Sequence, residues 1–295
     1  MSEDSSTRLR IGLPNGNLQE TTQRLFRQAG FELRVSDRSY YPDIDDPEIE
    51  CILMRPQEIP RYVEQGVMDC GITGYDWVFE NAADVAELAD LRAPWPNYGA
   101  VSWVLAVKQG SPFRTVADLG GKRIAAEAVG LTRQYLAKRG VEAQVEFSWG
   151  ATEVKPPLLA DAIVDVTETG SSLRANNLEV LDVILESTPR LIANRDALAD
   201  AWKSAKLERL KLLLMGSVRA ASRVVLAMNV PRSALDQILE LLPALNTPTV
   251  STLSDDDWVA VNTVVEERQV RELLPRLSEA GASGIIESPL NKIID

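Results

Sequence analysis

A cluster of hydroxyl side chains follows an apolar segment near the middle of the chain. Residues 160–166 read "ADAIVDV", which suits a strand that is buried on both faces. At the carboxyl end of that strand, where open α/β sheets bind their ligands, the chain places Thr169, Gly170, Ser171 and Ser172. Such a turn can direct several backbone N–H groups and three hydroxyls toward one anion. The pattern therefore predicts a phosphate pocket without a lysine.

Two acids, Asp165 and Glu168, come just before this turn. A carboxylate beside a phosphate repels it, whereas a carboxylate that accepts hydrogen bonds from ribose hydroxyls, or reaches Mg²⁺ through water, is satisfied. We therefore expect Asp165 to contact a ribose. Periodicity alone also fits a simpler interpretation, in which a strand is followed by an ordinary polar turn.

Composition limits the classes of function that the chain can perform. It has 295 residues, a formal charge of −12 and no histidine. The negative charge argues against a nucleic-acid surface, because neutralising phosphates requires a basic face. Without histidine, catalysis must rest on carboxylates, hydroxyls, cations, backbone amides or a bound metal.

The first residues and the cysteines indicate the compartment. The segment "MSEDSSTRLR" lacks the apolar core of a secretory signal, and no run approaches the roughly 18 apolar residues of a membrane span. Cys51 and Cys70 each lie inside an apolar run, which is typical of reduced core thiols. We therefore expect a cytoplasmic protein.

Strands and helices alternate over the first two thirds of the chain, which predicts α/β lobes with largely parallel sheets. A long helix is expected to end around Gly216, and residues 223–287 then follow the βαββαβ order of a ferredoxin-like domain. The earlier strands are expected at residues 9–13, 50–54, 68–72, 101–107, 122–127, 142–148 and 160–166, and the earlier helices at 19–29, 60–66, 75–81 and 131–139.

Six further segments add to the central pattern: "RIGLPNGNL", "RPQEIPRYVEQGVMDCGITGYDW", "LGGKRIAAEAVGLTRQYL", "NTPTVSTL", "DWVAVNTVV" and "GASGI". Together with the stretch from Glu153 through "LADAIVD" to "TGSSL", they closely resemble the ATP phosphoribosyltransferase family over essentially the whole chain. The last three segments resemble its long form, which carries a regulatory domain. The resemblance implies two periplasmic-binding-protein-like α/β lobes that form a catalytic cleft, followed by a ferredoxin-like, ACT-like domain.

This resemblance implies the first step of L-histidine biosynthesis. In that reaction, N1 of the adenine of ATP attacks C1 of the ribose of phosphoribosyl pyrophosphate (PRPP), pyrophosphate leaves, and C1 inverts. Adenine N1 carries no proton at neutral pH, so no general base is required and the lack of histidine is no objection. The enzyme must align two large anions and stabilise the departing pyrophosphate, for which Mg²⁺, arginines and backbone amides are suited.

The resemblance also implies functional residues, although it assigns no metal ligands. The catalytic residues would be Asp165 and Arg55. The PRPP-binding residues would be Glu153, Asp161, Asp165, Thr169, Gly170, Ser171, Ser172 and Leu173. The ATP-binding residues would be Asn15, Gly16, Asn17, Asp69, Gly71, Thr73 and Gly74. A regulatory site for L-histidine would contain Thr249, Val250 and Ser251 on one side and Gly281 and Ala282 on the other.

The first loop departs from the family's pattern, which often reads Lys-Gly-Arg at this place. This chain has Asn15, Gly16 and Asn17, so a cation for the pyrophosphate must come from elsewhere, with Arg10 and Arg55 as the alternatives. The family's "TGxTL" ending has become "TGSSL", in which Ser172 still supplies a hydroxyl.

The expected domains are one catalytic lobe of residues 1–100 and 186–217, a second lobe of residues 101–185 with the PRPP loop, and a histidine-binding domain of residues 218–295. The resemblance suggests a hexamer in equilibrium with dimers. Two alternatives remain: a two-lobed binding protein for a small anionic ligand, and a catalytically inactive regulatory paralogue. A nucleotide-dependent dehydrogenase is a weaker alternative, because no G-x-G-x-x-G follows the first strand.

Overall fold

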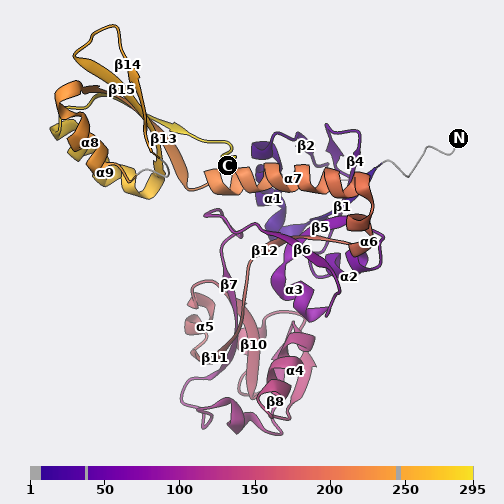
Figure 1. Cartoon of the computed structure of the whole chain (residues 1–295). Helices are drawn as coiled ribbons and strands as arrows, with labels where there is room; N and C mark the ends of the chain where they lie inside the picture. The colour runs from indigo at the N-terminus through magenta and orange to yellow at the C-terminus, as the bar shows by residue number, and fades with distance from the viewer. Residues whose placement is uncertain (1–7, 37–38, 244–246, 295) are drawn as a thin grey trace, which may run out of the picture. The chain divides into compact units, whose positions relative to one another are not determined.

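Residues 8–36, 39–243 and 247–294 are described by the computed structural model (Figure 1). Contacts between residues divide the chain into two units. The first unit runs up to Arg27 and from Phe31 to Lys211, and the second takes Gln28–Gly30 and the residues from Leu212 onward. The described part of the first unit contains two five-stranded sheets, and that of the second contains one four-stranded sheet.

The first sheet has the strand order β4-β1-β5-β12-β6. Strand β1 pairs in parallel with β4 and β5, whereas β12 runs antiparallel to β5 and β6. The strands are β1 (Leu9–Pro14), β4 (Ile49–Met54), β5 (Cys70–Gly74), β6 (Ala86–Asp90) and β12 (Pro189–Ala193). Connecting elements are the 3₁₀ turn η2 (Gly16–Leu18), α1 (Gln19–Ala29), the two-stranded ribbon β2 (Leu33–Arg34) and β3 (Asp43–Ile44), α2 (Ile59–Glu64) and α3 (Tyr75–Glu80).

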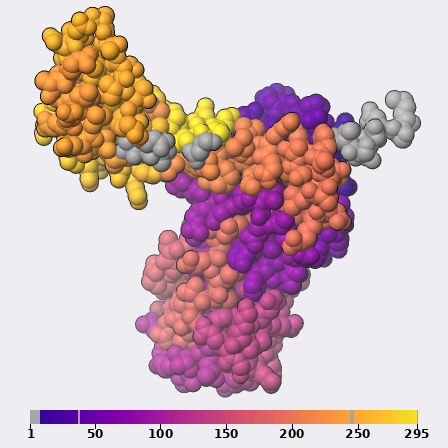
Figure 2. All heavy atoms as spheres, in the orientation of Figure 1, coloured from indigo at the N-terminus to yellow at the C-terminus, as the bar shows by residue number. Residues whose placement is uncertain are grey.

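The second sheet has the strand order β11-β7-β10-β8-β9. β10 runs parallel to β8 and antiparallel to β7, and its residues 162–164 are buried. The strands are β7 (Val101–Lys108), β8 (Arg123–Ala126), β9 (Gln144–Phe147), β10 (Ala162–Thr167) and β11 (Leu178–Ser187). The helices are η3 (Val116–Leu119), α4 (Val129–Lys138), η4 (Thr152–Val154) and α5 (Ser171–Ala175). Figure 2 shows one outer face of these elements with all heavy atoms drawn as spheres.

Both sheets follow one topology. In the first sheet, β1 lies between β4 and β5, and β12, which follows the second lobe in the chain, lies between β5 and β6. In the second sheet, β8 lies between β9 and β10, and β7, which follows the first lobe in the chain, lies between β10 and β11. The α/β class with two periplasmic-binding-protein-like lobes is therefore confirmed. The expectation of largely parallel sheets is wrong, because the crossing strands β7 and β12 run antiparallel to both of their neighbours.

Several other elements differ from the prediction. The sequence pattern does not predict β6, β11 or β12, whose sequences include charged residues such as Glu179 and Arg190. It predicts a turn at Thr73 and Gly74, but both residues belong to β5, and α3 begins directly at Tyr75. Cys51 on β4 and Cys70 on β5 are buried free thiols, as the sequence predicts.

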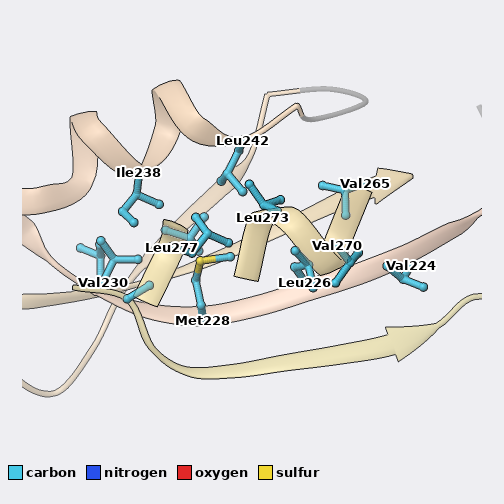
Figure 3. Close-up of a cluster of buried hydrophobic side chains, with 13 residues drawn as sticks. Val224, Leu226, Met228, Val230, Ile238, Leu242, Val265, Val270, Leu273 and Leu277 are labelled. Atoms are coloured by element: carbon cyan, nitrogen blue, oxygen red, sulfur yellow. The ribbon is translucent and has the colours of Figure 1, made fainter. Parts of the chain in front are cut away.

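The second unit contains a complete βαββαβ domain. Its sheet has the order β14-β15-β13-β16, and every neighbouring pair is antiparallel, which confirms the ferredoxin-like fold. Figure 3 shows apolar side chains of α8 and α9 that face those of the sheet, including Ile238, Leu277 and Leu226. Its elements are β13 (Arg223–Pro231), η5 (Arg232–Ala234), α8 (Leu235–Leu241), β14 (Thr249–Thr252), β15 (Trp258–Glu266), α9 (Glu267–Glu279) and β16 (Ser283–Pro289).

The long helix α7 (Ala201–Ala220) follows the short α6 (Arg195–Ala199) and does not stop at Gly216, as the sequence suggests. Gly216 permits close packing instead. A Cβ atom at this position would lie 2.5 Å from Ile294 Cδ1, and the Gly216 carbonyl accepts a hydrogen bond from the Ile293 N–H at 3.0 Å. This glycine therefore marks the place where the C-terminal segment docks on the helix, and not the end of the helix.

The helices that the structure describes were compared with the length and hydropathy that a membrane-spanning helix needs. None of them combines the length and the apolar character needed to cross a membrane.

Candidate active site

One cleft of the first unit is lined by residues from both of its sheets. It encloses about 300 Å³ and collects the ends of β1, β4 and β5 together with the loops that follow β8 and β10. Carboxyl ends of parallel strands are the usual ligand-binding edge of α/β sheets. The lining residues include Asn15, Gly16, Asn17, Arg55, Gln57, Gly74, Asp76, Trp77, Trp103, Glu127, Val166, Glu168 and Thr188.

The predicted phosphate turn continues directly from the end of β10. The hydroxyl of Thr167 accepts a hydrogen bond from the Gly170 N–H at 2.7 Å, and Gly170 has φ +70°, a left-handed conformation that glycine adopts without strain. The Thr169 hydroxyl donates to the Ser171 hydroxyl at 3.1 Å. This arrangement fixes the turn while it leaves Ser171 and Ser172 exposed.

Leu173 plays a different part in the same turn. Its side chain is buried in an apolar cluster with Val104 and Ile163, so it anchors α5 to the sheet and does not face a ligand. Sequence reasoning missed the next residue, Arg174, whose guanidinium donates to the Thr169 carbonyl at 2.9 Å. The short helix α5 therefore places the Arg174 guanidinium beside the phosphate turn, where the sequence predicts no lysine.

Asp165 lies in an environment that disfavours its charge. Burial is the main cause that raises the pKa of Asp165 to about 6, and the negative charges of Glu153 and Glu127 raise it further. A hydrogen bond from the Val166 N–H at 2.8 Å and the charge of Lys155 act in the opposite direction. Three acids from different segments thus share one region, which favours a cation or a hydroxyl-rich ligand beside them.

The acids also bear on whether the cleft suits Mg²⁺. Carboxylate oxygens are its preferred protein ligands, and the ion commonly takes only one or two of them and completes its shell with substrate phosphates and water. Within the described residues, no group of three or more His, Cys, Asp or Glu side chains is arranged to hold a metal. Asp165, Glu127 and Glu153 are therefore not arranged as a ready-made three-carboxylate metal site.

On the opposite side, the first loop lies against Arg55. A Cβ atom on Gly16, which has φ +76°, would lie 3.9 Å from Arg55 Nη1. The Asn15 N–H donates to the Met54 carbonyl at 2.9 Å, which joins the loops after β1 and β4. Asn15, Gly16, Asn17 and Arg55 are thus brought together in the cleft, and Arg55 is placed to supply the cation that this loop lacks.

Arg10, the other arginine considered for that role, lies elsewhere. Its guanidinium donates to the Gly66 carbonyl at 3.0 Å and lies 3.8 Å from Asp69. Asp69 is buried and forms a second ion pair with Lys203 at 2.8 Å. These contacts connect β1, β5 and α7, and neither Arg10 nor Asp69 lines the cleft.

Gly71 and Thr73 do not line the cleft either, and their contacts stabilise the fold. A Cβ atom on Gly71 would approach Ile59 Cγ2 to 2.4 Å, so this glycine allows α2 to pack on β5. The buried Thr73 hydroxyl donates to the Pro56 carbonyl at 2.7 Å and fixes the loop that carries Arg55. Of the predicted residues of β5, only Gly74 lines the cleft.

Asp161 precedes β10, whereas the phosphate turn follows it. Its carboxylate accepts a hydrogen bond from the Arg123 N–H at 2.9 Å. The structure therefore places Asp161 at the opposite end of the strand from Thr169 and Gly170, at the edge where α/β sheets do not usually bind ligands.

Sequence reasoning did not single out Asp76, which lines the cleft and is 5% exposed. Its carboxylate accepts hydrogen bonds from Trp103 Nε1 at 2.7 Å and from the Ser187 hydroxyl at 2.8 Å. Burial raises the pKa of Asp76, and these two bonds oppose that effect. Asp76 thereby connects α3 of one lobe to the crossing strand β7 and to the end of β11. No local sequence pattern predicts this role.

The residues expected to bind histidine are not brought together within the chain. Register across the second unit's sheet runs from Ser251 on β14 through Ala260 and Asn229 to Ser283 on β16. Three strand spacings of about 4.8 Å separate the ends of this row by roughly 14 Å. Thr249, Val250 and Ser251 therefore lie at one edge of the sheet, whereas Gly281 and Ala282 directly precede the strand at the other edge.

Comparison with known families agrees with this architecture. The profile of the ATP phosphoribosyltransferase family matches residues 55–216, and that of the HisG C-terminal domain matches residues 220–292. An ATP phosphoribosyltransferase of Desulforudis audaxviator is 58% identical over 287 residues, which are 97% of this chain and 99% of the relative. The corresponding protein of Thermodesulfovibrio yellowstonii is 55% identical over 286 residues, with 97% and 98% covered.

A solved structure supports the same assignment. A chain of the ATP phosphoribosyl transferase (HisG:HisZ) complex from Thermotoga maritima has a TM-score of 0.60 and 28% identity, and the match covers 70% of this chain and 98% of that one. Family profiles, near full-length relatives and the fold thus agree. The chain belongs to the ATP phosphoribosyltransferase family and carries that family's C-terminal domain.

Proposed function

We propose that this protein transfers the phosphoribosyl group of PRPP to N1 of ATP, giving phosphoribosyl-ATP and pyrophosphate, as the first step of L-histidine biosynthesis. The observation that carries the proposal is a cleft that Arg55, on the loop after β4, lines together with Glu127 and with Val166 and Glu168, which directly precede the phosphate turn. Family membership and relatives of more than 50% identity support the same reaction.

The turn after β10 is the proposed PRPP side. Backbone N–H groups near Gly170 and the hydroxyls of Thr169, Ser171 and Ser172 would bind the 5′-phosphate, with Arg174 adding positive charge. Asp165 would accept hydrogen bonds from the ribose hydroxyls, which recovers part of the cost of burying its charge. This side of the cleft would hold C1 of the ribose in place.

The loops after β1, β4 and β5 are the proposed ATP side. Asn15, Gly16 and Asn17 lie there with Arg55, whose charge is suited to the pyrophosphate that departs from PRPP. Mg²⁺, when bound with the substrates, would neutralise phosphate charge. Because adenine N1 is already unprotonated, the residues of the cleft need only align the two substrates and stabilise the leaving group.

The test is an assay for pyrophosphate release by the purified chain with ATP, PRPP and Mg²⁺. We expect turnover that depends on both substrates and is lost when EDTA removes the metal. Tight binding of a small anion without any turnover would support the alternative of a two-lobed binding protein. If turnover were absent and no partner protein restored it, the inactive-paralogue alternative would be favoured.

We also propose that the second unit binds L-histidine and that this binding inhibits the enzyme. The enzyme would act as an oligomer, either a dimer or a hexamer. A ligand outside the cleft inhibits only if it binds one global arrangement more tightly than another. The predicted residues occupy opposite edges of one sheet, so a complete site would require the edges of two chains to meet. This geometry supports a link between histidine binding and association of the chains.

Histidine inhibition should therefore depend on the exposed edge strand β14. The double change Thr249→Val and Ser251→Ala removes two exposed hydroxyls. We expect the inhibition constant for L-histidine to rise about tenfold, as for the loss of one or two hydrogen bonds, with kcat and both KM values unchanged. Thr252→Val, on the same strand but on the other face of the sheet, is the control. Unchanged inhibition in the double variant would remove β14 from the site.

A further inference from the structure

Gln57 lies in the cleft with an amide whose orientation is fixed. Its Nε2 donates to Glu127 Oε1 at 3.1 Å, across the cleft from the loop after β4 to the loop after β8. A carboxylate accepts and cannot donate when ionised, so this bond identifies which end of the amide is nitrogen. The other end, Oε1, is therefore an acceptor.

That acceptor lacks a partner. Among the described residues, Gln57 Oε1 is buried and makes no hydrogen bond, although the side chain as a whole is only half-buried and lines the cleft. A buried carbonyl oxygen without a donor is costly, and such atoms in folded proteins call for a specific explanation. Two other buried atoms without partners, Asn15 Oδ1 and Thr188 Oγ1, belong to residues of the same cleft.

The backbone that carries Gln57 is held in place from two sides. The Thr73 hydroxyl donates to the Pro56 carbonyl at 2.7 Å, and Asn81 Nδ2 donates to the Gln57 carbonyl at 3.0 Å. Such bonds preorganise the loop before a ligand arrives, which lowers the entropy cost of recognition. The unpaired oxygen is thus on a fixed support.

Flat apolar groups lie in the same cleft. The rings of Trp77 and Trp103 pack edge to face, with centroids 5.7 Å apart and planes at 85°, and Asp76 holds the Trp103 indole N–H. Both rings line the cleft, together with the apolar side chains of Val101 and Pro189. A pocket with apolar walls and a few directed polar groups is typical of a site for an aromatic ligand.

We propose that Gln57 Oε1 accepts a hydrogen bond from the 6-amino group of the adenine of ATP and is a specificity-determining residue of the reaction. This inference rests on the proposed function. The 6-amino group is the hydrogen-bond donor next to N1, the atom that attacks PRPP. Guanine carries a carbonyl oxygen at that position, which would face Gln57 Oε1 as a second acceptor. One contact would therefore select adenine and also orient its nucleophilic nitrogen.

The test compares ATP with purine riboside 5′-triphosphate, which lacks the 6-amino group but keeps an unprotonated N1. Binding of each nucleotide is measured by calorimetry, and turnover with PRPP is measured separately. We expect the wild-type protein to bind ATP about 10- to 100-fold more tightly than the analogue, because the analogue leaves the buried oxygen unpaired. In Gln57→Met, which keeps the length of the side chain, the preference should fall below about threefold through weaker binding of ATP.

Gln65→Met is the matched control, since Gln65 is exposed at the end of α2 and does not line the cleft. It should keep the wild-type preference, and PRPP affinity should be unchanged in both variants. If folded Gln57→Met retained the preference for ATP, this inference would be wrong while the proposed function stood. If the wild-type protein bound neither nucleotide, both would be wrong.

Discussion

Replacing Asp165 with asparagine is expected to lower kcat/KM for PRPP about 100-fold, because the amide exchanges a charged acceptor for a neutral one beside the ribose. ATP affinity measured in the absence of PRPP should change less than threefold. Steady-state kinetics with each substrate varied in turn will separate the two effects. A variant with normal PRPP kinetics and weakened ATP binding would reverse the placement of the two substrates.

Asp161→Asn is the matched control for this change. It makes the same replacement next to the same strand, at the end remote from the phosphate turn, where the side chain only accepts the Arg123 N–H. We expect its PRPP kinetics to stay within about threefold of wild type. A loss as large as that of Asp165→Asn would mean that Asp161 contacts the ribose after all.

The pH profile provides a second measurement of Asp165. Because the pKa of its carboxyl is raised to about 6, mainly by burial, the ionised form that accepts hydrogen bonds is lost as the pH falls through 6. We expect kcat/KM for PRPP to fall below this pH in the wild-type protein. Phosphates of PRPP titrate in the same pH range and also affect kcat/KM. The decrease in kcat/KM that occurs in the wild-type protein but not in Asp165→Asn is therefore assigned to Asp165.

Stability should change in the opposite direction to activity. The unfolded value of an aspartate pKa is about 3.9, so between about pH 4 and pH 6 the folded state binds the proton of Asp165 more tightly. The free energy of unfolding therefore decreases as the pH rises through this window, and the full penalty is present above pH 6. After an allowance for the remaining solvent contact of the side chain, Asp165→Asn should raise the free energy of unfolding by about 1 to 2 kcal/mol at pH 7. Urea unfolding of the wild-type protein and of Asp165→Asn at pH 7 and pH 4 would measure this difference in the free energy of unfolding. We expect no difference at pH 4.

A valine at Gly170 is expected to reduce PRPP use about 100-fold. The residue has φ +70°, which a β-branched side chain tolerates poorly, and a Cβ atom would lie 2.9 Å from Arg174 Nη1. Both effects shift the N–H that Thr167 holds at 2.7 Å, and displacement of even about 1 Å at a binding site can cost 100-fold in rate. ATP binding should persist, as measured by calorimetry.

Gly140→Val distinguishes strain from lost binding. Gly140 has a similar φ of +68° at the end of α4, and nothing lies within 4 Å of the place that a Cβ atom would take. Both valine variants should lose comparable stability, by about 1 to 2 kcal/mol, but only Gly170→Val should lose PRPP use. Equal losses of activity would show that backbone strain acts globally and that the turn has no special part.

Several local elements could be predicted from the sequence because their signals are local. The periodicity of residues 9–29 predicts β1 and α1 nearly to the residue, and the order of strands and helices after residue 222 predicts the ferredoxin-like domain. Motif spacing also identifies the turn at Thr169 and Gly170 and the acids that precede it. β11 and the crossing strand β12 were missed, because their burial depends on neighbours that are distant in sequence.

By itself, the sequence determined the family, the α/β class and the position of a hydroxyl-rich turn after β10, since these depend on residue types at short spacing. Only the tertiary structure decided which of the predicted residues share a site. It placed Arg55 in the cleft and Arg10 against Asp69, and it brought Gln57 to Glu127, 70 positions later in the chain. The physical reason is that a strand's two ends and a side chain's direction are fixed by pairing and packing with remote segments, which no short window of sequence contains.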